Sequence, residues 1–341
     1  MWYNITMKML SETIKIEPVS SAVFDFYFKD LKYGVFDIET TGLSHKYSRL
    51  ILSGFALPQD DGTLLVKQIF SEGGDEKDVI RETLNELYEL DFIITFNGKS
   101  FDVPYLTGRA DALNFSSARI PYNLDLFNVV KNFSDIGKFT PNLKQKTLEN
   151  YLGLWDHRKD EIHGGESIEL YADYLQSGDE ALEETILLHN SDDVKQLYRL
   201  LAILKQTDFH RAMAIGGFPT ALFETDKIKL QKNKLTISGI QTDPSNPLLY
   251  KGFMDHKGIS CDFSHETFTV IINLINHQDV IFADLHKLQL PLEEFKNSGG
   301  LSGQFLVLSD RGSVNHLAIN TLTKEILGLF EDDFTSEMNF D

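Results

Sequence analysis

The fold of this chain is decided by the stretch Val35-Phe36-Asp37-Ile38-Glu39-Thr40-Thr41-Gly42, in which a short apolar strand leads directly into two carboxylates. Alternate side chains of a strand point to the same face, so we expect Asp37 and Glu39 to lie side by side. Two adjacent carboxylates repel each other and lose solvation, which is costly unless a cation or a proton lies between them. A divalent cation with oxygen ligands is the simplest solution, so the sequence predicts a metal site at this strand.

A second segment places another carboxylate after a strand. The apolar run Ile93-Ile94-Thr95-Phe96 ends at the polar turn Asn97-Gly98, and we expect a helix to follow over residues 101–113. This helix would carry Asp102 in its first turn.

A third segment, His189-Asn190-Ser191-Asp192-Asp193-Val194, lies inside a long amphipathic stretch that predicts a helix over residues 179–204. His189 and Asp193 are four residues apart, so they share one face of that helix. Asp192 lies about 100° round the helix from Asp193, so only one of the two can face the site, and the position before Val194 favours Asp193.

In this order, Asp-x-Glu, Asn-Gly-x-x-Phe-Asp and His-x-x-x-Asp resemble the motifs of the DEDD exonuclease superfamily, and within it those of the YprB-type RNase H-like family. The likeness runs from about residue 34 to residue 204. It includes the intervening pieces Leu148-Glu149-Asn150-Tyr151-Leu152-Gly153 and Arg158-Lys159-Asp160. The resemblance implies an α/β, RNase H-like fold in which helices flank a mixed sheet. It also implies a metal-dependent nuclease, most often a 3′–5′ exonuclease.

The resemblance further implies a role for each carboxylate. Asp37 would bridge two metal ions, Glu39 and Asp193 would complete the site that activates water, and Asp102 would hold the ion facing the leaving group. Two metals about 3.5–4 Å apart support in-line displacement at phosphorus. All four ligands are hard oxygen donors, which favours Mg²⁺ or Mn²⁺ over zinc.

His189 stands where DEDD nucleases carry a tyrosine or a histidine that orients or deprotonates the attacking water. Its spacing of four residues before Asp193 is that of the tyrosine form, so this chain has a histidine in the tyrosine register. An ordinary pKa near 6.5 suits a general base at neutral pH. The alternative is a helix histidine that only hydrogen-bonds a neighbouring group.

Two residues of the turn are candidates for substrate binding. Asn97 could contact a nucleotide or cap the helix that carries Asp102. Lys99 could meet a phosphate, although a solvated loop lysine is the alternative. Asp125 could support the metal ligands or serve in a turn or cap.

Composition limits the classes of protein that fit this chain. Its 341 residues carry 32 basic and 51 acidic side chains, a formal net charge of −19, which predicts weak and strongly salt-dependent affinity for nucleic acid. One cysteine, Cys261, excludes an intramolecular disulfide and a cysteine-rich zinc site. No apolar run approaches the roughly 20 residues that span a bilayer, and residues 1–15 mix charged with apolar residues. We therefore expect a cytoplasmic protein without membrane contact.

The pattern of apolar and polar residues divides the chain into three segments. Residues 1–32 form an N-terminal segment without a clear pattern, and residues 33–205 match the expected RNase H-like domain. Residues 206–341 contain β-branched, strand-like runs between turns, followed by a helix expected over residues 314–330 and a frayed acidic tail. We interpret them as a smaller β-rich accessory region, a possible site for a protein partner.

Two hypotheses of different classes follow. The first is a two-metal nuclease that hydrolyses single-stranded DNA or RNA. The second is a nucleic-acid-binding or partner-recruiting module with a vestigial site. Four retained carboxylates argue against the second, because a buried, unpaired carboxylate is costly to keep without a metal.

Overall fold

The computed structural model describes residues 7–19, 21–115, 119–154, 157–160, 162, 165–243 and 245–338. The chain divides into two compact units, Met1–Asp25 with Asp30–Thr207 and Phe26–Lys29 with Asp208–Asp341. In the described residues, no helix is both long enough and apolar enough to cross a membrane.

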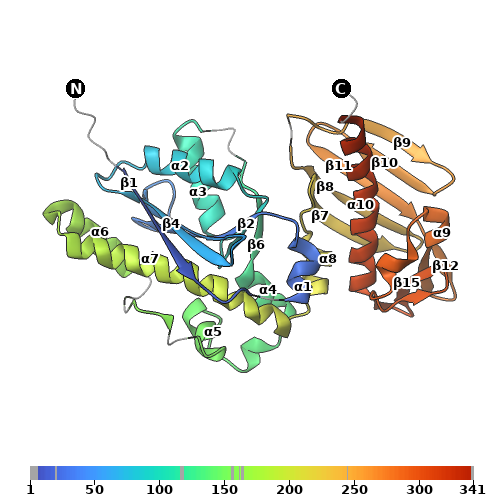
Figure 1. Cartoon of the computed structure of the whole chain (residues 1–341), viewed down its shortest axis with the longest axis horizontal. Coiled ribbons are helices and arrows are strands. Elements are labelled where there is room, and N and C mark those ends of the chain that lie inside the picture. The colour runs from blue at the N-terminus through green and yellow to red at the C-terminus, as the bar shows by residue number, and fades with distance from the viewer. Residues whose placement is uncertain are drawn as a thin grey trace. The chain divides into compact units, whose positions relative to one another are not determined.

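The first unit is built on a six-stranded mixed sheet, as the predicted α/β fold requires (Figure 1). Its strands are β1 (Met7–Lys15), β2 (Tyr33–Thr40), β3 (Leu50–Pro58), β4 (Thr63–Ser71), β5 (Phe92–Thr95) and β6 (Tyr122–Asp125), in the spatial order β1-β4-β3-β2-β5-β6. Strands β2, β5 and β6 are parallel to one another, whereas β1 to β4 pair antiparallel. The helices of this half of the chain are α1 (Ala22–Phe28), α2 (Lys77–Tyr88), α3 (Asp102–Ala112), α4 (Leu126–Phe133), α5 (Gln145–Tyr151), α6 (Glu166–Ser177) and α7 (Glu180–Leu200).

Helices cover both faces of this sheet (Figure 1). On one face, Phe36 and Ile38 of β2 pack in a core with side chains of α2 and α3. On the other, Ile51 and Phe70 pack against α6 and α7. The neighbours Ser53 and Gly54 show the division, because Ser53 is hydrogen-bonded to Thr83 of α2 while Gly54 lies against α7.

Strand β1 corrects the sequence analysis, which leaves residues 1–32 without an assigned role. The structure pairs Met7–Lys15 with β4 as the outer strand of the sheet. Most of its side chains are exposed or only half-buried, so the strand lacks the alternating apolar pattern that would reveal it. Residues Ala22–Phe28, in the same N-terminal segment, form helix α1.

The second unit contains separate antiparallel sheets, in agreement with the β-rich region predicted after residue 206. One sheet has the order β7-β8-β11-β10-β9 and the other β12-β13-β15-β14, with β16 paired to β15. The strands are β7 (Phe223–Gln231), β8 (Lys234–Gln241), β9 (Tyr250–Met254), β10 (Ile259–Phe263), β11 (Thr267–Asn273), β12 (Ile275–His277), β13 (Val280–Asp284), β14 (Leu301–Ser302), β15 (Phe305–Asp310) and β16 (Ser313–Val314). The helices are α8 (Phe209–Gly216), α9 (Leu285–Leu288) and α10 (His316–Met338).

The core of this unit is formed by both sheets and by one face of α10. Cys261 of β10 is buried in it, as a small apolar residue would be. Helix α10 is longer than predicted, because it continues to Met338 through the acidic residues expected to fray.

Candidate active site

The alternation along β2 creates the site. Phe36 and Ile38 enter the core under α2 and α3, so the side chains of Asp37 and Glu39 point to the opposite face, toward α7. The pairing of β2 with β3 shifts register directly after Glu39. Such irregularities bend a strand and re-aim its side chains, and here the shift lies at a carboxylate of the site.

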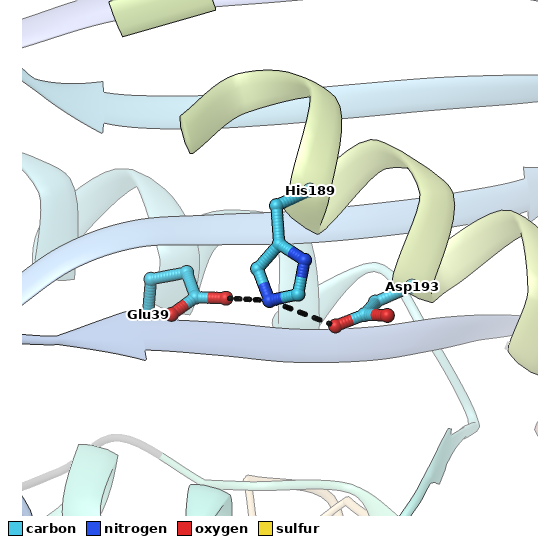
Figure 2. A group of neighbouring side chains, drawn as sticks. All are labelled: Glu39, His189 and Asp193. Carbon is cyan, nitrogen blue, oxygen red and sulfur yellow. Dashed lines mark ion pairs between the residues drawn. The ribbon is translucent and has the colours of Figure 1, made fainter. Parts of the chain in front are cut away.

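Glu39, His189 and Asp193 form a close cluster between β2 and α7 (Figure 2). Nε2 of His189 lies 3.5 Å from Oε1 of Glu39 and 3.5 Å from Oδ2 of Asp193. One ligand atom from each residue falls within 4.8 Å of the others, which is a suitable spacing for a shared cation. The i, i+4 spacing thus places His189 and Asp193 on one helical face, as predicted.

The other nitrogen of His189 is held by Asp160, with 2.7 Å between Nδ1 and Oδ2. Burial alone would raise the pKa of Asp160, but its hydrogen bonds with His189 and Arg158 keep that pKa below its usual range. An ionised carboxylate only accepts hydrogen bonds, so Nδ1 of His189 carries the proton that is donated to Asp160. This bond fixes the ring so that Nε2 faces Glu39 and Asp193.

Arg158 lies in the loop between α5 and α6, next to Lys159 and Asp160. It is a buried cation, with a side chain 1% exposed, and it connects this loop to the site. Its guanidinium binds Glu149 through two nitrogens, at 2.9 and 2.7 Å. Nη1 reaches Oδ1 of Asp160 at 2.6 Å and Oδ1 of Asp193 at 2.7 Å. Only arginine offers donors in a planar fork that can bind several carboxylates in this way.

Asp192 faces away from this cluster. Its Oδ2 accepts hydrogen bonds from the backbone N–H groups of Lys159 and Asp160, at 2.5 and 2.8 Å. The two neighbouring aspartates therefore have different roles. Asp192 holds the loop around Lys159, whereas Asp193 faces Glu39 and His189. Asp193 is the one of the pair that the sequence favoured.

Asp37 is positioned by Asn190, whose Nδ2 donates to Oδ2 of Asp37 at 3.0 Å. Asn190 is itself fixed by Gln68, which donates to its Oδ1. Gly54, the cross-strand partner of Asp37, makes this approach possible, because a Cβ there would lie 2.0 Å from Oδ1 of Asn190. The glycine is required by this close contact with α7.

Asp102 opens α3 next to β2, where its Oδ1 accepts a hydrogen bond from the backbone N–H of Ile38 at 3.3 Å. Burial raises the pKa of Asp102 to about 7, against the effect of that hydrogen bond. The pKa of Asp37 lies well above its usual range through burial, followed by the charges of Asp102, Asp193 and Glu39. These four carboxyl groups are therefore close enough to repel one another.

The remaining groups of the site respond to the same charges. Burial raises the pKa of Glu39, although His189 and a hydrogen bond from Ser167, at 2.7 Å, oppose it. For His189, burial would lower the pKa, but Asp160, Asp193 and Glu39 raise it overall. The cluster is thus an excess of buried negative charge, which a divalent cation would offset.

The turn after β5 is held by Asp125, whose carboxylate accepts from the backbone N–H groups of Asn97 and Lys99, both at 3.0 Å. Asp125 also caps α4. Asn97 has a left-handed backbone with φ of 67°, and the N-cap of α3 is Phe101, so Asn97 is not the cap. Lys99 is exposed, with its ammonium 5.6 Å from the ring of Tyr122.

Sequence reasoning missed four groups that position the candidate residues. Arg158, Asp160, Ser167 and Asn190 all contact a predicted site residue. Arg158, Asp160 and Glu149 lie in the intervening pieces that carry the family resemblance, which was the available signal. Asn190 stands next to His189 but has no motif role of its own, and nothing in the sequence marks Ser167.

Comparisons with known proteins give weak likenesses to individual proteins and one match to a family. A stretch of 49 residues is 39% identical to DNA polymerase 1 of Sulfurisphaera ohwakuensis, covering 14% of this chain and 6% of that protein. Among solved structures, a family B DNA polymerase from Pyrobaculum calidifontis gives a TM-score of 0.42 at 15% identity, covering 86% of this chain and 46% of the polymerase. A structure of exonuclease I gives a TM-score of 0.36 at 11% identity, covering 67% of this chain and 54% of that one.

This chain therefore spans a small fraction of the curated relative that it matches and about half of each of these structures. The family comparison covers more of the sequence. Residues 35–205, half of the chain, match the family model RNase_H_2 of the RNase H superfamily. These residues include both strands and helices that carry the candidate site. The chain belongs to the RNase H superfamily.

Proposed function

We propose that this protein is a divalent-metal-dependent nuclease of the YprB-type, DEDD group, and that it acts as a 3′–5′ exonuclease on single-stranded DNA or RNA. One observation carries the proposal. Nε2 of His189 lies between Glu39 and Asp193, and burial raises the pKa of the carboxyl groups of Asp37 and Asp102 in the same site. Membership of the RNase H superfamily supports it.

The donor set fits two Mg²⁺ or Mn²⁺ ions. Asp37, Glu39, Asp102 and Asp193 are the ligands we propose. The pKa values of Asp37, Glu39 and Asp102 are raised, and such carboxyl groups gain most from a cation. Asp193 lies with Glu39 and His189 in the close cluster. When bound, such ions lower the pKa of water and stabilise charge on the phosphoryl oxygens. Arg158 already neutralises part of the charge of Asp193 on its Oδ1 side, and Oδ2 faces His189.

His189 is the proton acceptor in this proposal. With Nδ1–H held by Asp160, the free Nε2 of a neutral ring can take a proton from a water molecule between the carboxylates. Asp160 would then stabilise the imidazolium that forms, as orienting carboxylates do in other histidine-dependent sites. Bound cations would lower the pKa of His189 again and favour the neutral ring that this role needs.

Other assignments stay proposals. We propose that Asn97 and Lys99 contact the substrate. Both lie in the turn after β5, where Asp125 of β6 accepts hydrogen bonds from their backbone N–H groups. We further propose that residues 33–205 carry the nuclease, that residues 206–341 form an accessory region able to bind a protein partner, and that the protein acts in the cytoplasm.

A degradation assay tests the function. End-labelled single- and double-stranded DNA and RNA would be incubated with the full chain and Mn²⁺, Mg²⁺ or EDTA. We expect a ladder that shortens from the 3′ end with either metal and no cleavage in EDTA. A folded protein that cleaves none of these substrates would instead favour the binding-module hypothesis, in which the site is vestigial.

Stability should depend on pH and metal in a way that reports the carboxyl cluster. A carboxyl group has a pKa of about 4 in an unfolded chain, so the raised pKa of Asp102, about 7, makes the folded state bind more protons between these values. In EDTA, the free energy of unfolding should therefore fall as pH rises from 4 to 7, by up to about 4 kcal/mol from this group. The raised pKa of His189 adds a further loss of stability above about pH 6.5, the ordinary pKa of histidine.

Chemical denaturation between pH 4 and pH 8, with EDTA or Mn²⁺, measures the effect. Asp102→Asn should make the fall of stability with pH smaller in EDTA, and millimolar Mn²⁺ should stabilise the wild type most at pH 8. If the variant shows the same dependence of unfolding free energy on pH as the wild type, and Mn²⁺ does not stabilise the wild type, these carboxyl groups do not form a metal site.

A further inference from the structure

A groove of about 460 Å³ lies in the first unit on the flank of α7 away from the candidate site. It is lined by the outer strand β1, by α7 and by the loop around Lys159. Ser191 and Lys195 line it from α7, on a helical face about 200° from those of His189 and Asp193. The same helix therefore presents the site on one side and the groove on the other.

The groove is basic although the chain as a whole is strongly acidic. Four permanent cations line it, from three elements of the unit, namely Lys15, Lys159, Lys195 and Arg199. Among the described residues that line the groove, the carboxylates that oppose them are Glu12 and Asp192. The chain has 51 acidic and 32 basic residues, so this balance reverses that of the whole molecule.

Much of this positive charge is available to a ligand. Asp192 is occupied by two backbone N–H groups, and Glu12 is paired with Lys195. Arg199 donates to the amide oxygen of Gln196 and, within the described part of the chain, forms no ion pair with a carboxylate. Lys15 and Lys159 are exposed.

The arrangement fits an extended polyanion better than a single phosphate. The four cations come from the end of β1, from the loop around Lys159 and from successive turns of α7, so they are not gathered on one element. The groove also adjoins the site through the loop, because Lys159 lies between Arg158 and Asp160, whose side chains contact Asp193 and His189. A strand bound in the groove would thus reach the site, on the other side of α7, by passing this loop.

We propose that this groove binds the sugar-phosphate backbone of the single-stranded nucleic acid on which the candidate site acts, several nucleotides from the scissile bond. This inference rests on the proposed function, since it extends the substrate contact of that site. The excess of four cations over two carboxylates in the groove would let so acidic a chain hold a polyanion. Phosphate contacts of this kind position a strand without reading its sequence.

A binding measurement in EDTA tests the groove without requiring hydrolysis. Fluorescence anisotropy would follow a labelled 20-nucleotide single-stranded DNA binding to the wild type and to Lys15→Glu/Lys159→Glu. Both side chains are exposed, so the fold should tolerate the change. We expect affinity at least tenfold weaker at low salt, and a plot of log affinity against log salt less steep by about 0.7 per lost phosphate contact.

The matched control is Lys32→Glu/Lys77→Glu, which makes the same charge change at two exposed lysines outside the groove, one of them on α2 across the sheet. It should bind within twofold of the wild type. If both variants lose affinity for the oligonucleotide equally, or if neither does, the proposal that the groove binds nucleic acid is wrong. If the chain cleaves nucleic acid but Lys15→Glu/Lys159→Glu binds it normally, the groove proposal is wrong and the nuclease proposal stands. If it cleaves nothing but the groove variant binds weakly, only the nuclease proposal fails.

Discussion

Replacing Asp193 with asparagine is expected to lower the rate of metal-dependent hydrolysis by about 10³-fold or more, with little effect on folding. The carboxylate is one of the proposed ligands, lies 3.5 Å from Nε2 of His189 and is 20% exposed, so the amide fits the same space. Loss of one ligand removes several kcal/mol of transition-state stabilisation, and each 1.36 kcal/mol is a factor of ten in rate. Initial rates on an end-labelled oligonucleotide with saturating Mn²⁺ measure the loss.

Asp192→Asn is the control that the sequence itself supplies, because it makes the same chemical change one residue away. The amide oxygen can still accept the two backbone hydrogen bonds that anchor the loop, so we expect a loss of activity under tenfold. Comparable losses in the two variants, or full activity in Asp193→Asn, would show that the assignment of the metal ligand is wrong.

Replacing Arg158 with methionine is expected to destabilise the protein by about 3–5 kcal/mol. The guanidinium is buried and binds Glu149, Asp160 and Asp193, which would lose their common partner. Removal of one member of a buried ion pair is strongly destabilising, because the remaining charges stay buried without compensation. Chemical denaturation at neutral pH, in EDTA, measures the change.

Two further variants serve as comparisons for Arg158→Met. Arg81 forms ion pairs with Asp78 and Glu82 on the surface of α2, so Arg81→Met should cost less than about 1 kcal/mol. Arg158→Lys keeps the charge but cannot bind Glu149 through two nitrogens, and should lie between methionine and the wild type. If Arg158→Met unfolds with the same free energy as Arg81→Met, the buried network does not stabilise the fold.

Local periodicity made part of the site predictable from the sequence. The strand period of two places Asp37 and Glu39 on one face of β2, and the helix period places His189 and Asp193 on one face of α7. Both depend on residues a few positions apart, so they follow from backbone geometry without knowledge of the rest of the chain. The order of the motifs then predicted the family that the comparison with residues 35–205 confirms at the level of the superfamily.

Contacts between distant residues were decided only by the tertiary structure. Asp37 and Asn190 are 153 residues apart, and Glu39 and Ser167 are 128 apart, so no local pattern could reveal either hydrogen bond. Strand β1 was missed for a related reason, since an outer strand with exposed side chains needs no apolar alternation. The basic groove depends on the pairing of that strand with β4 and on the loop held against α7. The sequence by itself thus determined which residues could form the site, whereas packing determined what holds them there and what surface lies beside them.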